Sequence, residues 1–337
     1  MEEKKRTPWR RWVVLLLMIV GCALGGGLSV LGIQGIPAVL PEITVDAERL
    51  METPLFGDFY LVNTLPTLVF TILILVVPLA YFTNRAIKQS LNTDLAPRGV
   101  GALMEAFLEL IYNLTESSAG AKWAGAIFPW FATIMIYVLL ANLLKLLPGF
   151  ESIGILHHAA PGHAVSDMGW FASILPAEQE EGFILIPFFR GISLDLNFTF
   201  ALAIISVVMT QVIGFRAQGF GYLSKFFNTR NLFKVPFFGA MDLIVSWLEL
   251  ISEIAKIISF SFRLFFNMFA GIILVAVVSS LLGFITIAPS MLFLFELFVG
   301  VIQAFVFGML TMVFMAMATA GHGHEEEHVE EPVENLI

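Results

Sequence analysis

The sequence predicts an all-α integral membrane protein with about six membrane helices. Of its 337 residues, 58% are hydrophobic and only 13% are charged, whereas soluble domains carry roughly 25% charged residues. Several apolar tracts reach the length of about 20 residues that a helix needs to cross about 30 Å of hydrocarbon. The single cysteine, Cys22, excludes an intramolecular disulfide and a cysteine-built metal site.

Six apolar tracts are long enough to span a membrane. The first four are Trp12–Ile33, Leu65–Phe82, Ile127–Leu147 and Leu196–Phe215. The last two, Phe237–Leu282 and Ala288–Ala320, are joined only by a short, turn-like segment. The longer one would form a helix of about 70 Å, more than twice the thickness of the hydrocarbon layer. Because neither tract has an internal proline that would force a break, the pair predicts a long, tilted helical hairpin.

One further helix is predicted to be amphipathic rather than spanning. In the segment Ala96–Lys122, apolar residues recur at helical spacing, and Glu105 and Glu109 lie off that stripe. This pattern is typical of a helix that lies along a membrane surface or returns partway into it.

Basic residues near the helix ends predict the orientation in the membrane. The N-terminal stretch MEEKKRTPWRRW, the segment Asn84–Arg98, and the group Lys225, Arg230 and Lys234 are expected on the cytoplasmic side. The loop Gly149–Asp195 and the segment Pro37–Tyr60 are then outside, and both termini are cytoplasmic. This organisation predicts an extra N-terminal helix with an external segment over 1–60, a membrane core over 61–320, and an acidic, His/Glu-rich tail over 321–337.

Two short features have alternative interpretations. The residues Ile19–Cys22 resemble a lipoprotein cleavage site, but the apolar run continues to Ile33 and favours an uncleaved span. His157, His158 and His163 in one loop, and HGHEEEH in the tail, are residue types that bind metals. Neither group has regular ligand spacing, so a solvated loop and a solvated tail are the favoured interpretation.

A narrow polar seam runs along each of the two long tracts. Residues three, four or seven positions apart share a face of a helix. In the first tract this face gathers Glu249, Ser252, Lys256, Ser259, Arg263 and Asn267, and in the second it gathers Glu296, Gln303 and Thr311. An arginine at the middle of a membrane helix costs about 2.5–3.5 kcal/mol. We therefore expect the two seams to face each other or a water-filled path.

The chemistry of these side chains predicts ion translocation. Gln303 is the natural neighbour of Arg263, because its amide oxygen accepts a hydrogen bond from a guanidinium group. Glu296 is a carboxylate within the membrane and is suited to relaying protons. Arg263 keeps its own proton, so it is a poor carrier but a good electrostatic gate that forces a facing carboxylic acid to ionise. The structural alternative is a network that merely pins the two helices together.

Several segments carry a resemblance to a known family. The most specific are SFSFRLFFNMFAG at Ser259–Gly271 and QAFVFGMLTMVFMAMA at Gln303–Ala318. They are joined by ANLLKLLPG at Ala141–Gly149, by DLNFTFALA at Asp195–Ala203, and by the proline-led entry to the long tract. From about Leu65 to Ala320, the chain resembles subunit a of the rotary F-type ATP synthases.

The resemblance implies a mechanism. Subunit a is expected to pack its hairpin against a rotating ring of c subunits, each with a membrane carboxylate, and to form two offset proton half-channels. By the motif match, Arg263 separates the half-channels, and Asn267 and Gln303 are the polar residues around it. Glu296 matches a titratable half-channel residue. Ile272 stands where some members carry a second titratable group, so Glu296 is expected to carry more of the relay alone.

Other polar residues are expected to line the half-channels. Asp195, Asn197 and Asn142 are the candidates on the outer side. Glu249, Ser252 and Lys256 are the candidates on the cytoplasmic side. Lys256 is equally explained as a side chain that snorkels to the interface.

The resemblance also implies partners and a location. They are the c-subunit ring, the peripheral stalk b subunits, the rest of the ATP synthase complex and membrane lipid, at the cell inner (plasma) membrane. Because the sequence has no GxxxxGK[ST] loop, the chain is not expected to make ATP by itself. No cofactor, metal or nucleic acid is expected.

Two other functions are alternatives to this one. A secondary cation/proton transporter would need internal repeats and broken helices around a midplane site, and the sequence shows no such repeat. A purely structural membrane anchor would not need the aligned Arg263, Glu296 and Gln303. The coupling ion stays open between proton and sodium, and Glu296 favours the proton.

Overall fold

The computed structural model describes most of the membrane core. The described residues are 47–51, 53–54, 57–58, 60–93, 99–147, 150–151, 153–167, 172–226, 236–281 and 287–320. The predicted span Trp12–Ile33 with Cys22 lies outside them, and so do Arg230, Lys234 and the His/Glu-rich tail.

Five helices of the described chain are long and apolar enough to cross a membrane. They contain the spans Thr64–Ser90, Gly101–Leu144, Leu196–Leu223, Leu243–Val278 and Met291–Thr319. Each overlaps one of the last five predicted tracts. The predicted helical membrane core is therefore confirmed.

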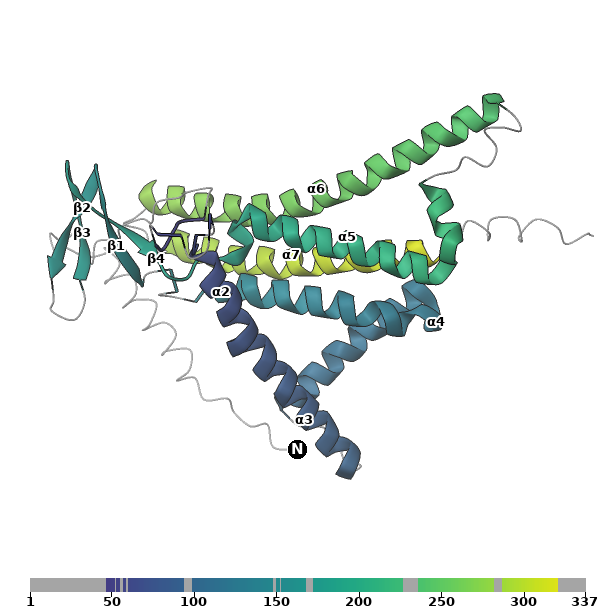
Figure 1. The fold of residues 1–337 in the computed structure, drawn as a ribbon. Coiled ribbons are helices and arrows are strands. Elements are labelled where there is room, and N and C mark those ends of the chain that lie inside the picture. The colour runs from purple at the N-terminus through teal and green to yellow at the C-terminus, as the bar shows by residue number, and fades with distance from the viewer. Residues whose placement is uncertain are drawn as a thin grey trace, which may run out of the picture. The chain divides into compact units, whose positions relative to one another are not determined.

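The first of these helices changes its winding partway along. It consists of α2 (Thr64–Phe70), a π-helical segment η3 (Thr71–Val76) and α3 (Val77–Thr93) (Figure 1). Pro78 follows the π-helical segment almost directly. A proline within a helix cannot donate its backbone hydrogen bond, and its ring crowds the carbonyl four residues earlier. The π-helical segment contains Ile74, the residue four positions before Pro78.

The helix α4 (Val100–Leu144) has two arms that meet at Gly120 (Figure 1). The φ angle of Gly120 is 75°, in the left-handed region that favours glycine. The arm before Gly120 corresponds to the predicted amphipathic segment Ala96–Lys122. The arm after it corresponds to the predicted span Ile127–Leu147.

A four-stranded antiparallel sheet occupies most of the segment that the sequence predicted as an external loop. Its strands are β1 (Gly154–Ala159), β2 (Gly162–Asp167), β3 (Ala172–Gln179) and β4 (Gly182–Pro187), in the order β1-β4-β2-β3. The sequence predicted a loop without strands here, and the structure corrects that prediction with a sheet. Each strand has only six to eight residues, too short to stand out beside the long apolar tracts.

The remaining helices follow the sequence closely. They are the 3-10 helix η4 (Ile192–Leu194), α5 (Leu196–Gln218), the 3-10 helix η5 (Gly219–Lys225), α6 (Pro236–Leu281) and α7 (Ile287–Thr319). The two last helices have 46 and 33 residues and run without a break. The prediction of two long, continuous helices is confirmed.

The chain divides into two compact units. Unit 1 contains Met1–Val69, Asn142–Asp195 and Phe266–Val301. Unit 2 contains Phe70–Ala141, Leu196–Phe265 and Ile302–Ile337. Both long helices contribute to each unit, because the boundaries fall within α6 and α7.

Unit 2 has an apolar core between three helices. Phe131 and Met135 of α4 pack in one cluster with Ile213 of α5 and Met312 of α7. A Cβ atom added at Gly308 of α7 would lie only 2.8 Å from the Cβ of Met135, so the two helices approach closely there. Small residues at such crossings let membrane helices pack backbone to backbone.

Hydrogen bonds also cross between the helices of unit 2. The hydroxyl groups of Ser206 on α5 and Thr311 on α7 share a hydrogen bond of 2.8 Å. Those of Thr199 on α5 and Ser261 on α6 share one of 3.0 Å. All four hydroxyl groups are buried, so each helix contact satisfies polar groups that would otherwise face hydrocarbon.

Candidate functional site

Arg263 lies on the exposed side of α6. Ser252, Ser259 and Asn267 of the same predicted seam are also exposed, and Glu249 and Lys256 are partly buried. The buried side of α6 is mostly apolar and includes Phe260, Leu264, Phe265 and Met268. The sequence predicted that this seam faces either the seam of α7 or a water-filled path, and the exposure of Arg263 favours the second of these.

The polar seam of α7 is buried instead. Glu296, Gln303 and Thr311 are 7%, 3% and 0% exposed. The hydroxyl group of Thr311 also donates to the carbonyl oxygen of Phe307 at 2.9 Å. The two seams thus differ in exposure, and the predicted contact between Arg263 and Gln303 stays a prediction.

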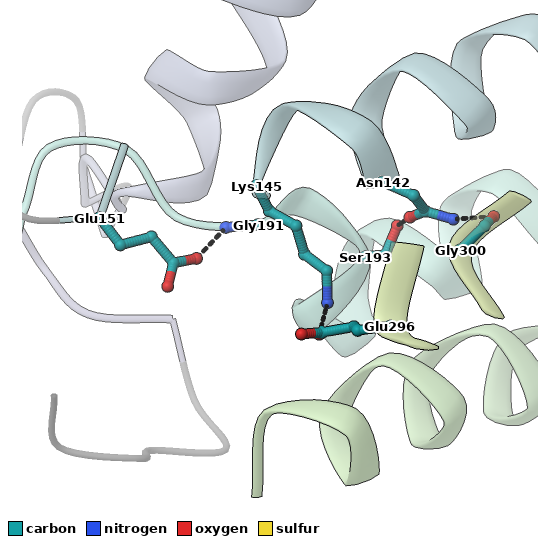
Figure 2. Close-up of polar contacts among 7 residues, drawn as sticks. All are labelled: Asn142, Lys145, Glu151, Gly191, Ser193, Glu296 and Gly300. Carbon is teal, nitrogen blue, oxygen red and sulfur yellow. Dashed lines mark hydrogen bonds and ion pairs between the residues drawn. The ribbon is translucent and has the colours of Figure 1, made fainter. Parts of the chain in front are cut away.

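Glu296 belongs to a buried ion pair in unit 1. Figure 2 shows the side chain of Lys145, just after the end of α4, reaching the Glu296 carboxylate. The Lys145 Nζ and Glu296 Oε1 atoms are 2.5 Å apart, and the two side chains are 3% and 8% exposed. A pair buried this deeply is strongly interdependent, since removing one partner leaves an uncompensated charge.

Asn142 lies beside this ion pair and joins three segments of unit 1 (Figure 2). Its Nδ2 donates to the carbonyl oxygen of Gly300 on α7 at 3.1 Å. Its Oδ1 accepts a hydrogen bond of 2.6 Å from the Ser193 hydroxyl group. Asn142 is 0% exposed, so this predicted outer-channel residue holds the last turn of α4 against the helix that carries Glu296.

The other two predicted outer residues differ from each other. Asp195 is buried, and its carboxylate accepts a hydrogen bond of 2.7 Å from the Thr64 hydroxyl group. Asn197, in the first turn of α5, is exposed. In the same unit as Asp195, the Thr67 hydroxyl group accepts a hydrogen bond from the backbone N–H of Arg190 at 3.0 Å. The start of α2 is therefore tied to the segment before α5.

A second carboxylate, that of Glu151, lies near Lys145. It accepts a hydrogen bond of 3.0 Å from the backbone N–H of Gly191 (Figure 2). Burial raises the pKa of Glu151, although the Gly191 hydrogen bond and the positive charges of Lys145 and Arg190 act in the opposite direction. Burial likewise lowers the pKa of Lys145, against the attraction of Glu296 and Glu151. This part of unit 1 thus combines several charges in a poorly hydrated environment.

One member of the predicted cytoplasmic group, Lys256, forms an ion pair with a residue outside that group. Lys256 Nζ lies 2.8 Å from Oε1 of Glu253, one turn earlier on α6. The same ammonium group lies 4.7 Å from the centre of the Phe314 ring on α7. Lys256 therefore has specific partners inside unit 2, which argues against snorkelling as its only role.

The histidines of the predicted loop lie in the sheet. His157 and His158 are on β1 and His163 is on β2. The His158 ring packs 4.2 Å from the centre of the Phe183 ring. Within the described residues, no group of three or more His, Cys, Asp or Glu side chains is placed to hold a metal ion.

Lys145, Glu151 and Glu253 were not among the predicted site residues. Glu253 is four residues after Glu249 and three before Lys256, so the same helical spacing places it on the predicted seam. Lys145 stands in the quoted segment ANLLKLLPG, where a lysine interrupts an apolar run. A search for the cation that balances the buried Glu296 would have found it.

Comparison with known proteins gives a consistent result. The family model described as ATP synthase A chain matches residues 66–316. The chain is 29% identical to ATP synthase subunit a of Acidothermus cellulolyticus over 238 residues, 69% of this chain and 71% of that relative. It is 29% identical to the same subunit of Mycobacterium bovis over 257 residues, 76% of this chain and 85% of that relative. It is 30% identical to that of Desulforamulus reducens over 243 residues, 69% of this chain and 71% of that relative.

Proposed function

We propose that Arg263 separates two proton half-channels. The premise is that the chain belongs to the ATP synthase A chain family, whose members are the proton-translocating stator subunit of the F-type ATP synthase. The observation that carries this proposal is the exposure of Arg263 on the middle of a membrane helix. A charge there is costly in contact with lipid. A partner that presents carboxylates to it removes that cost.

On this proposal, the partner is the c-subunit ring, and it covers the exposed face of α6. Large apolar side chains accompany the seam on that helix, including Ile258, Phe262 and Phe266, which are exposed in the single chain. Such a surface, apolar with a few polar groups, fits a helical partner inside the membrane. The peripheral stalk b subunits, the remainder of the complex and membrane lipid cover other faces.

On this proposal, the complex lies in the plasma membrane and both termini of the subunit are in the cytoplasm. The proton path begins outside the cell. Asp195, Asn197 and Asn142 line the outer half-channel, and Glu296 relays the proton to a ring carboxylate. Asn267 and Gln303 supply polar contacts around the arginine. When a protonated ring carboxyl meets Arg263, the fixed positive charge favours its ionised form. The proton is released toward Glu249, Ser252 and Lys256.

Arg263 suits the role of a barrier because its guanidinium group stays protonated. It attracts each ring carboxylate, yet does not pass a proton from one half-channel to the other. This subunit is a non-catalytic member of the complex, so ATP synthesis takes place on other subunits. The transporter alternative is set aside because the chain belongs to this family.

The test compares the native complex with Arg263→Ala in liposomes. We expect ion-driven ATP synthesis to be lost, and passive proton leak through the membrane sector, after removal of the catalytic head, to be retained or raised. Arg216→Ala is the matched control, since Arg216 is an exposed arginine in the last turn of α5, away from the seam. Unchanged synthesis in Arg263→Ala would reduce Arg263 to a structural tie and overturn the proposal.

A further inference from the structure

The buried ion pair between Lys145 and Glu296 brings a fixed positive charge to the proposed proton relay. The two atoms that carry the charges are 2.5 Å apart, and both side chains are almost fully buried. Each charge has lost most of its hydration and depends on the other for compensation. A change in the charge of Glu296 therefore alters the electrostatic energy of Lys145 directly.

The position of the Glu296 carboxylate is restricted from other sides as well. A Cβ at Gly271 of α6 would lie 3.2 Å from the Glu296 Oε1 atom, so the backbone of α6 approaches it closely. About one turn along α7, Asn142 binds the carbonyl oxygen of Gly300 and also accepts a hydrogen bond from Ser193. The carboxylate therefore has little freedom to leave Lys145 (Figure 2).

We propose that Lys145 is a positioning residue for proton entry, whose ammonium group holds the Glu296 carboxylate ionised and in place until an external proton arrives. This inference rests on the proposed role of Glu296 as the relay. The resting pair has no net charge. It takes up one proton on the carboxylate while Lys145 keeps its own. When Glu296 passes that proton to a ring carboxylate, the ion pair forms again.

Unit 1 contains other charged groups besides this ion pair. Glu151 and Arg190 act on the same cluster, and Asp195 is held by Thr64. Residues 266–281 of α6, the stretch that includes Gly271, contain no titratable side chain. Of the two carboxylates that attract Lys145, Glu296 has the larger effect and Glu151 the smaller. Removing the charge of Lys145 therefore acts mainly on Glu296.

The experiment measures passive proton conduction against external pH, in liposomes that hold the complex with its catalytic head removed. In Lys145→Gln, we expect the pH of half-maximal conduction to rise by about one unit or more, because the Glu296 carboxylate loses the opposite charge beside it. In Lys145→Arg, which keeps the positive charge, we expect the native midpoint. A lysine that only stabilises the fold would give conduction lowered by the same factor at every pH, and that result overturns the proposal.

Two further comparisons separate the possible failures. If Glu296→Gln conducts protons like the native complex at every pH, Glu296 is not the relay, and this part of the proposed function is overturned. Glu296→Gln that fails to conduct, together with an unshifted Lys145→Gln, overturns only the role of Lys145. Where Lys145→Gln does not assemble, Lys145→Arg decides: a native midpoint supports the need for a positive charge, and a midpoint moved by a unit or more contradicts it.

Discussion

The Asn142 side chain holds the backbone carbonyl oxygen of Gly300 by a 3.1 Å hydrogen bond, across 158 residues of sequence. Asn142→Leu keeps the approximate size but loses this bond and the one from Ser193. We expect a loss of stability of about 1–3 kcal/mol, because a buried hydroxyl group is left without its acceptor. Thermal unfolding of the purified membrane sector measures it. Asn142→Asp still accepts the hydrogen bond from Ser193, so its thermal midpoint should lie between those of the native protein and Asn142→Leu. An unchanged midpoint in Asn142→Leu would contradict the role of Asn142.

The close approach of α7 to α4 at Gly308 gives a second prediction. In Gly308→Ala, the new Cβ would meet the Cβ of Met135 at 2.8 Å. We expect about 1–3 kcal/mol of destabilisation from overpacking, visible as a lower thermal midpoint. Gly125→Ala on α4 is the control, since a Cβ there meets nothing within 4 Å. A lower midpoint for Gly125→Ala than for Gly308→Ala would show that the crossing is not tight.

The hydrogen bond between Ser206 and Thr311 is suited to a double-mutant cycle. Ser206→Ala and Thr311→Val each remove one hydroxyl group of the 2.8 Å contact. We expect a coupling energy of about 0.6 kcal/mol, the average for such bonds between membrane helices. Thermal midpoints of the two single variants and the double variant supply the measurement. Strictly additive effects would mean that the two hydroxyl groups do not support each other.

The environment of Glu151 predicts a pH dependence of stability. Burial raises its pKa above the ordinary value of 4.5, so the native state keeps the proton to a higher pH than the unfolded state does. As pH rises above 4.5, the unfolded state ionises first and native stability falls until the native pKa is passed. Glu151→Gln should reduce this fall. The measurement is the thermal midpoint against pH, with Glu180→Gln in the exposed turn after β3 as the control.

The exposed side of α6 predicts where the proposed c-subunit ring docks. With Cys22 replaced, a cysteine at Ile258 should form cross-links to a cysteine on the outer helix of the c ring, because Ile258 lies on the exposed side. A cysteine at Val208, exposed on α5, should not. Cross-linking yields in native membranes, read on gels, test this. Equal yields at both positions would place the ring elsewhere.

Apolar length was enough to predict the helices from the sequence, and periodicity was enough to predict which side of α6 carries Arg263. A tract such as Phe237–Leu282 has no other stable state inside a membrane, since its backbone must satisfy its own hydrogen bonds. The bend at Gly120 was not predicted, because many glycines in helices keep helical angles. The sheet was missed because its short strands lie between stronger signals.

The candidate site was predicted less completely than the fold. Glu296 and Asn142 were found from spacing and motif, and both lie in one buried cluster. Lys145, the partner of Glu296, lies 151 positions away in the sequence, and no local pattern links the two. Helical periodicity relates residues on one helix. It does not say which end of another helix will meet them.

The uncovered arginine on α6 has a consequence for how the cell makes this protein. On our proposal, a newly inserted chain that has not met its ring partner exposes Arg263 to lipid, at a cost of about 2.5–3.5 kcal/mol. That cost disappears when the partner covers Arg263, so the free subunit is less stable in the membrane than the assembled one. Assembly with the partner is then favoured as soon as the inserted chain meets it.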